Sequence, residues 1–438
     1  MAETTTPLQT PTTGQIAKVT FASALGGFIE YFQLFIASII GATVWPKIFF
    51  TGGIATTVGF SIASVGVAYV MRPVGGFFFG RIGDRVGRKN TLVLTLILMG
   101  IGTFAIGFVP DYAAIGLAAP IILFVCRGVY GLGLGGEYGG GVSWILEFAA
   151  KSKWRSFWSV WAAPANIALA VAASSTAALE ASMSTAAFDS TGWRILFLLS
   201  GVIIVIAFVV RYRLAESPLF KQIKDRNDVA KRPASEAIRK YWKQIIALAI
   251  IGGSIQGGVT TSLLTPFSLS YLGAQGLSPA FGASMLSLSN AIGIIAFVAG
   301  PWFSEKLGRK LHLLISIIWA IIGVALFLPL VGTGLVSMIA LAYIIPEVQV
   351  GFNNSAVQAI SGETFPIRYR YSGAGFSYQL GNGFVAGMIV AFVIPFLLKS
   401  FGIKGTAPYI VGILIVWQLI AMACLLLLKE TKKADLSL

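Results

Sequence analysis

Long apolar runs recur along this 438-residue chain and constrain its fold more than any other feature. Each run is long enough for a helix to cross about 30 Å of hydrocarbon. We count twelve, which predicts an all-α membrane protein with both termini on one side. The runs lie at residues 19–45, 54–80, 90–109, 113–147, 154–180, 193–213, 242–272, 279–303, 311–331, 334–362, 370–398 and 405–428.

The basic residues indicate which side that is. The chain holds 32 Lys and Arg against 17 Asp and Glu, a net charge of +15. In a soluble protein this excess would point to nucleic acid, but most of these bases fall in the tails and in alternate short loops. That is the positive-inside distribution. We therefore expect a lipid bilayer and no nucleic acid as partner, a cell membrane as location, and both termini in the cytoplasm.

Residues suited to catalysis or metal binding are scarce. Cys126 and Cys424 both lie inside apolar runs, and His312 is the single histidine. Neither a disulfide framework nor a zinc site is predicted. The sequence has no Gly-x-x-x-x-Gly-Lys-Ser/Thr phosphate loop, which argues against a pump with its own ATPase. We expect no cofactor, no metal and no enzymatic activity. Residues 1–17 lack the pattern of a cleavable signal peptide.

The chain also repeats itself. The stretch Gly80–Lys89 returns as Phe303–Lys310, with an acid, a base, a glycine and two further bases in the same order. Residues 214–241 form the long polar segment that divides six runs from six. The predicted organisation is a tail at 1–18, a bundle at 19–213, a linker at 214–241, a bundle at 242–428 and a tail at 429–438. Parallel six-span halves are typical of transporters with a midplane substrate site.

The paired turns resemble the signature of the major facilitator superfamily. Other motifs resemble its metabolite:proton symporter branch, which includes carriers of citrate, 2-oxoglutarate, shikimate, and proline or betaine. These motifs are Glu30-Tyr-Phe, Arg72-Pro-Val-Gly-Gly76, Arg127 with Gly135-Gly-Glu-Tyr138, Gly192-Trp-Arg-Ile195, Glu216-Ser-Pro218 and Phe365-Pro-Ile-Arg-Tyr369. The resemblance implies the major facilitator fold, two pseudo-symmetric six-helix bundles that move a small metabolite with protons by alternating access. We expect a monomer.

Two positions depart from the branch pattern. Gln33 stands where the branch usually has an acid, and Tyr130 stands where the fourth span usually has glutamine. The missing acid leaves open a facilitator or exchanger that needs no proton.

Five charged residues fall well inside the predicted spans: Glu30, Arg72, Arg127, Glu137 and Glu347. A charge at the bilayer centre costs about 3 kcal/mol, so each is a candidate functional residue. Glu30 and Arg127 lie at similar depths in spans that the resemblance places at the central cavity. We predict that they face each other and couple transport to protons. A permanent pair that only holds the helices in register is the alternative.

Arg72 lies too deep to reach water easily, and Pro73 favours a local bend beside it. It is predicted either to contact an anionic substrate or to pair with Glu137. In the tenth span, Glu347, Asn354 and Gln358 share one helical face. A single amide in a span is more often a packing hydrogen bond. The full predicted substrate-binding set is Arg72, Gln33, Tyr130, Glu137, Gln256, Glu347, Asn354, Gln379 and Asn382.

The two basic turns are predicted to form a conformational latch. An acid near a helix N-terminus interacts favourably with the helix dipole, and flanking bases can hold adjacent helix ends. Neutralising Asp84 should therefore change the transport rate more than substrate binding. The predicted latch residues are Asp84, Arg85, Arg88, Glu305 and Arg309.

The substrate class remains between two choices. Buried arginines favour an organic acid, while the buried acids keep a zwitterion such as a betaine open. Two rival functions are an exporter of drug-like compounds and a membrane receptor or sensor that binds without transporting.

Overall fold

The structure is a computed structural model that describes residues 11–52, 54–255, 267–268, 271–277, 279–389 and 393–436. Regular structure within these ranges is helical, without a strand. The first half consists of α1 (Thr13–Thr43), α2 (Trp45–Ile48), α3 (Ile54–Val86), α4 (Arg88–Ile106), α5 (Tyr112–Ile115), α6 (Ala118–Phe148), α7 (Arg155–Ser159), η1 (Val160–Ala162), α8 (Ala165–Ala181), α9 (Thr185–Ala187), η2 (Phe188–Gly192) and α10 (Trp193–Tyr212).

The linker begins with α11 (Pro218–Asp225). The second half consists of α12 (Pro233–Ile255), α14 (Pro279–Leu307), α15 (Arg309–Gly332), α16 (Val336–Glu363), α17 (Arg370–Tyr378), η3 (Gln379–Val385), α18 (Ala386–Met388), α19 (Ile394–Cys424) and η5 (Leu425–Leu427). Nine helices in the described part of the chain are long and apolar enough to cross a membrane. The predicted all-α membrane class is confirmed, and the number twelve stays a prediction.

Several helices are interrupted, and the residues at the breaks explain why. Pro164 separates η1 from α8, because proline has no backbone N–H to continue a helix. Gly402 lies inside α19 with φ of 64°, a conformation that glycine adopts freely. The segment η3 is π-helical, a form often found at functional sites. The predicted fifth span is therefore two helices, and α19 bends between the last two predicted runs.

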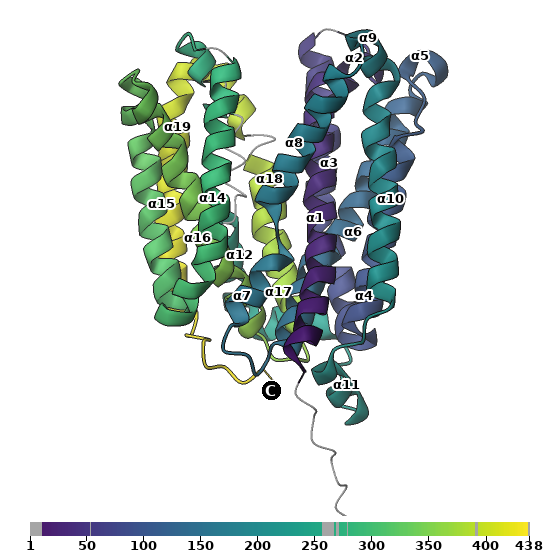
Figure 1. The fold of residues 1–438 in the computed structure, drawn as a ribbon, viewed down its shortest axis with the longest axis vertical. Coiled ribbons are helices and arrows are strands. Elements are labelled where there is room, and N and C mark those ends of the chain that lie inside the picture. The colour runs from purple at the N-terminus through teal and green to yellow at the C-terminus, as the bar shows by residue number, and fades with distance from the viewer. Residues whose placement is uncertain are drawn as a thin grey trace, which may run out of the picture.

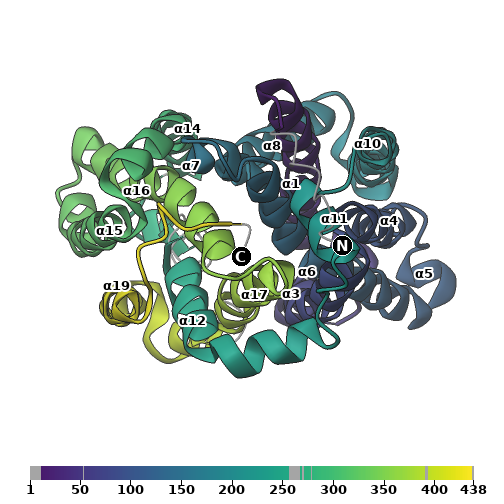
Figure 2. The same cartoon turned by 90° about the horizontal axis from the view of Figure 1, so that it is seen from below.

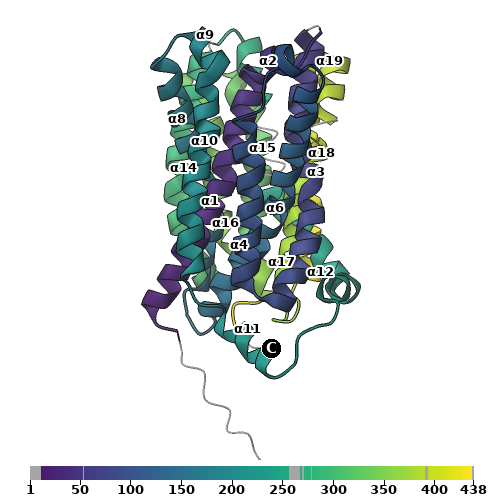
Figure 3. The ribbon, with the colours of Figure 1, turned by 90° about the vertical axis from the view of Figure 1, so that its right-hand side faces the viewer.

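The two halves lie side by side (Figure 1). Helices α1–α10, in purple to teal, and α12–α19, in green to yellow, lie close together at the lower end and apart at the upper end. The long helices run nearly parallel in the side view (Figure 3). Helix α3 contacts α17 and η3, while α14 contacts α7 and α8. Helix α6 contacts α17 and α16 as well, so several helices of each half form the interface.

The outer surface is apolar, as expected for helices in lipid. Large side chains on several helices expose more than half of their surface, among them Phe21, Ile121, Val205, Ile295 and Val416. Polar and charged residues are instead enclosed between helices. This arrangement suits lipid, because exposing an apolar side chain to hydrocarbon carries no free-energy penalty. Exposing an unpaired polar group there costs roughly several kcal/mol.

The linker runs beneath the helices (Figure 2). The Ser217 hydroxyl accepts the Phe220 N–H at 3.1 Å and caps α11, whose Leu219 and Ile223 are buried. Helix α12 then kinks at Tyr241, the residue at which the predicted linker ends.

Candidate functional site

Arg72 is the centre of a polar bridge between the two halves. It lies on α3, is 1% exposed, and donates from Nε to Gln379 Oε1 at 2.7 Å and from Nη2 to Glu30 Oε1 at 3.4 Å. Gln379 opens η3, and its own amide donates at 3.1 Å to the carbonyl groups of Leu134 and Gly135 on α6. A buried arginine thus joins an acid of its own half to an amide of the other.

The predicted contact between Glu30 and Arg127 is wrong, because Tyr130 lies between them. The Tyr130 hydroxyl donates to the Glu30 backbone carbonyl at 2.6 Å, and the Arg127 guanidinium lies 4.9 Å from the Tyr130 ring centre. Depth along a helix follows from the sequence, whereas the direction of a side chain depends on how the helix is rotated. Glu30 is rotated toward Arg72.

Arg127 is the buried arginine of the site that keeps free donors. It is 1% exposed, and its Nε and Nη2 have no hydrogen-bond partner within the described ranges. A buried guanidinium normally has its donors satisfied, because leaving them unpaired is costly. Unpaired donors at such a position are available to an anion.

Glu137 pairs with Arg211 of α10, so the predicted alternative of an Arg72–Glu137 pair is also wrong. Arg211 donates from Nη1 and Nη2 to the two carboxylate oxygens, and it also donates to the Ala22 and Leu92 carbonyl groups. Gly26 makes room for this pair, because a Cβ there would overlap the guanidinium. Arg211 stands near the end of the sixth apolar run, where the positive-inside pattern predicts a base in a loop, but it is fully buried. The pair clamps four helices of the first half.

Three tyrosines that sequence analysis missed surround the bridge. The Tyr138 and Tyr378 rings stack at 3.5 Å between centres, and the hydroxyl groups of Tyr31 and Tyr378 are hydrogen-bonded. The Arg72 guanidinium lies 5.9 Å from the Tyr378 ring centre. Tyr31 and Tyr138 each follow a candidate acid directly in the chain, which was the available signal.

The other predicted polar residues are dispersed. Gln33 accepts a hydrogen bond from the Thr103 hydroxyl at 2.9 Å, which is packing between α1 and α4. Asn382 is buried on η3. Gln358 donates to Asn354 at 3.2 Å, and Asn354 donates to the Ala163 carbonyl of the first half at 3.3 Å. Gln256 lies outside the described residues.

The end that carries the turns at 81–89 and 306–310 is here called the basic end, and it is the lower end in Figure 1. There Asp84 is fully buried and accepts the backbone N–H groups of Tyr371 at 3.1 Å and Ser372 at 2.8 Å. Both belong to the first turn of α17, in the other half. Arg88 holds the same carboxylate at 3.1 Å. Asp84 therefore caps a helix across the interface.

The second turn does the same in the opposite direction. Glu305 accepts the backbone N–H of Ser156 on α7 at 2.6 Å, and Arg309 holds Glu305 at 2.9 Å. Arg85 differs from the other predicted latch residues: it is exposed and makes no ion pair with any described residue.

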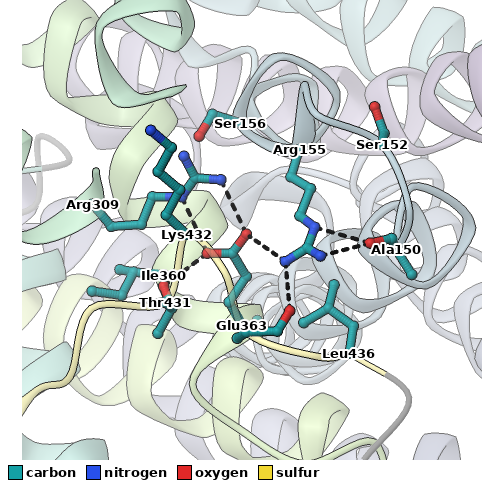
Figure 4. A network of polar contacts seen from close by, with 12 residues as sticks. Ala150, Ser152, Arg155, Ser156, Arg309, Ile360, Glu363, Thr431, Lys432 and Leu436 are labelled. Atoms are coloured by element: carbon teal, nitrogen blue, oxygen red, sulfur yellow. Dashed lines mark hydrogen bonds and ion pairs between the residues drawn. The ribbon is translucent and has the colours of Figure 1, made fainter. Parts of the chain in front are cut away.

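Two glutamates at the basic end join arginines from both halves. Glu147 binds Arg88 at 2.9 Å and Arg370 at 3.5 Å. Glu363 binds Arg309 at 3.1 Å and Arg155 at 3.6 Å (Figure 4). In the sequence, Glu147 and Arg155 follow the fourth apolar run as Glu363 and Arg370 follow the tenth, but the predicted latch did not include these four residues.

Residues 429–436, here called the tail segment, cross from the second half to the first. The Thr431 hydroxyl donates to Glu363 at 2.8 Å (Figure 4). Arg155 then donates to the Ala434 carbonyl at 2.9 Å, and Arg370 donates to the Leu436 carbonyl at 2.8 Å. Leu436 is buried against apolar residues of α1 and α6.

A repeated acid caps the helix after each basic turn. Gly87 and Gly308 precede α4 and α15 with φ of 132° and 90°, and neither has a side chain to cap the helix. Glu216 accepts the N–H of Arg88 at 3.1 Å, and Glu430 accepts the N–H of Arg309 at 3.0 Å. Burial raises the pKa of Glu216. Burial also acts on Glu430, but the surrounding backbone N–H groups bring its pKa below the ordinary value.

Comparison with known proteins gives one family. The model of the Major Facilitator Superfamily matches residues 19–386. The inner membrane metabolite transport protein YhjE of Escherichia coli (strain K12) is 30% identical over 428 residues, covering 96% of this chain and 95% of that protein. The shikimate transporter of the same organism is 28% identical, covering 95% of each. Its proline/betaine transporter is 28% identical, covering 86% of this chain and 76% of that protein.

Solved structures agree on the fold. The proton:xylose symporter XylE bound to 6-bromo-6-deoxy-D-glucose superposes with a TM-score of 0.77 at 15% identity, covering 97% of this chain and 98% of that one.

Proposed function

Because this chain belongs to the Major Facilitator Superfamily and is a metabolite transporter, we propose that it carries a small organic acid together with a proton. Its relatives are membrane transporters, and the chain is not an enzyme. We propose further that it works as a monomer, since both halves of the site come from one chain. The observation that carries the substrate class is Arg127.

Arg127 supports an anionic substrate because its Nε and Nη2 have no hydrogen-bond partner among the described residues, whereas the neighbouring arginines have carboxylate partners. Arg72 is occupied by Glu30 and Gln379, and Arg211 is occupied by Glu137. A carboxylate at Arg127 would accept charge-assisted hydrogen bonds, each worth about 1.5–3 kcal/mol. Of the arginines in this central group, Arg127 is thus the one that gains most from a ligand.

The Glu30–Arg72–Gln379 bridge supports coupling between the substrate and the movement of the halves. Arg72 Nη2 bonds to Glu30 of its own half, and Arg72 Nε bonds to Gln379 of the other half. A change in the charge of Glu30 therefore acts on a side chain that contacts both halves. If Glu30 is neutralised, Arg72 loses its carboxylate and is free to turn toward another anion. Glu30 therefore stays a candidate for proton coupling, acting through Arg72 instead of Arg127.

Alternating access is supported by the contacts at the basic end. Asp84, Glu305, Glu147 and Glu363 all bind groups of the opposite half there. By the positive-inside rule this end faces the cytoplasm, along with both termini. The described arrangement then corresponds to a transporter closed toward the cytoplasm, and transport requires these contacts to break.

A binding test on the purified, full-length protein addresses Arg127 first. Shikimate, succinate, citrate and glycine betaine are tested by thermal shift with wild type, Arg127→Gln and Arg194→Gln. We expect stabilisation by at least one acid, and a loss of affinity of about 10-fold or more in Arg127→Gln. Arg194 is the control: it is a partly buried arginine at the start of α10, it forms no ion pair among the described residues, and it donates to the Gly107 and Val109 carbonyl groups.

The outcome that contradicts the anion site is equal affinity in wild type and Arg127→Gln. Binding of betaine alone would favour the zwitterion instead of the acid. Uptake into proteoliposomes with an inward proton gradient then tests coupling. Accumulation of the bound acid is expected from a symporter, whereas equilibration without accumulation indicates a facilitator. Binding without any uptake indicates a receptor.

A further inference from the structure

Glu347 is the one charged residue in the membrane interior of the second half. Between Lys243 and Lys399 the charged residues are the turn Glu305–Lys310, Glu347 and the group from Glu363 to Arg370. No lysine or arginine occurs in 244–305, 311–367 or 371–398. A counter-ion for Glu347 would therefore have to come from the first half.

The first half supplies a neutral amide in that place. Glu347 Oε1 on α16 accepts a hydrogen bond from Asn166 Nδ2 on α8 at 2.9 Å, across the interface. Both residues are partly exposed. Gly293 on α14 adjoins the pair, and a Cβ there would lie 3.0 Å from Glu347 Cγ and 3.3 Å from Asn166 Nδ2. The glycine leaves room for the contact.

Charged and titratable groups on the neighbouring elements have other partners. None of the basic residues in the described ranges forms an ion pair with Glu347, whereas Glu30 and Glu137 both have an arginine. The groups that α15, α7 and α6 present to α16 lie toward the basic end: His312 stacks on Phe352, Arg155 pairs with Glu363, and Tyr138 bonds to Ser361.

We propose that Glu347 binds the co-transported proton. A carboxylate without a cation is costly inside a membrane, so at the contact with Asn166 the group takes a proton and becomes the neutral acid. When the halves move and the contact with Asn166 opens to water, hydration favours the carboxylate and the same proton returns to solvent. The inference rests on the proposed proton symport and names the group that carries the proton.

Infrared spectroscopy tests the site without a substrate. Reconstituted full-length protein is compared between about pH 6 and about pH 9, where a carboxyl group with an ordinary pKa is almost fully ionised at both ends of the range. We expect wild type to show the C=O band of a protonated carboxyl group that disappears toward high pH. Glu347→Gln should lose the part of this band that Glu347 contributes, while Glu216, whose pKa is raised by burial, contributes equally to both proteins. Glu347→Asp should keep a band at a shifted frequency. Glu30→Gln tests the competing candidate and should retain the contribution of Glu347, and Asp189→Asn, which removes an ion-paired carboxyl group outside the site, is the control.

Each outcome decides the assignment. A band of unchanged intensity in Glu347→Gln, or no such band in wild type, overturns it. Loss in Glu30→Gln but not in Glu347→Gln would assign the proton to Glu30. Proteoliposomes loaded with a pH dye then report protons moved per molecule of shikimate or succinate. If wild type moves no protons, the proposed symport itself fails. If wild type is coupled and Glu347→Gln stays coupled, only the assignment to Glu347 fails.

Discussion

The two basic turns have the same sequence pattern but hold the opposite half with different strength. Asp84 is fully buried and accepts two backbone N–H groups of α17, whereas the Glu305 side chain is 11% exposed and accepts one from α7. Helix α17 has nine residues and α7 has five, so α17 presents the larger helix dipole to its acid.

The residues just before each acid explain the difference. In the first turn a Cβ at Gly80 would lie 2.8 Å from Ser372 Cα, and one at Gly83 would lie 2.1 Å from the Tyr371 ring. The corresponding positions of the second turn are Pro301 and Ser304. Two glycines thus let α17 approach α3 closely. The comparison shows that both turns bind the opposite half through an acid held by an arginine, and that closer packing makes the first turn the tighter one.

The largest expected effect is that of Asp84→Asn. This change keeps the size of the side chain but removes the charge that binds two N–H groups and Arg88, a loss of about 2–3 kcal/mol. The population open at the basic end should rise by about 30- to 100-fold, and the exchange rate should change more than substrate affinity. Spin labels at the exposed residues Arg85 and Lys306 report the opening, since both native cysteines are buried.

The role assigned to Asp84 in the first turn is contradicted if Asp84→Asn loses substrate affinity while its rate of substrate exchange stays normal. That result would place Asp84 in the substrate site instead of the latch.

Glu305→Gln should have a smaller effect on the same distance measurement. The carboxylate is partly exposed and binds one N–H of the other half, so about 1 kcal/mol is lost and the open population rises about 5-fold. An effect equal to that of Asp84→Asn would show that the two turns contribute alike, despite their different burial.

Truncation after Lys433 should have the smallest effect. It removes the carbonyl acceptors of Arg155 and Arg370 in the tail segment, but both arginines keep their glutamates. Releasing the segment also returns conformational entropy, which offsets part of the loss, so we expect about a 2-fold rise in the open population. Removal of residues 437–438 alone is the control. A larger effect than that of Glu305→Gln would make the tail segment a principal part of the closed end.

Much of the membrane fold could be predicted, and less of the site. Apolar run length predicted the helices, and the repeated turns predicted two similar halves. The sequence predicted that Asp84 lies near a helix N-terminus. It did not predict that this helix belongs to the other half. Gln379 was predicted as a polar lining residue, and the structure gives it Arg72 as partner. Arg211 was misplaced because a base near the end of an apolar run looks the same whether it faces water or a buried acid.

The pattern of apolar and charged residues determined by itself that this protein spans a membrane and that few charges lie inside the spans. The repeated turns predicted two similar halves. These properties depend on residue type and on the 1.5 Å rise per residue of a helix, which set the depth of each side chain. Helix rotation and packing alone decided the partners. Glu30 pairs with Arg72, Glu137 pairs with Arg211, and Glu347 bonds to an amide, while Arg127 Nε and Nη2 have no partner in the described part of the chain. Sequence could not give these pairings, because the rotation of a helix follows from its contacts with distant helices.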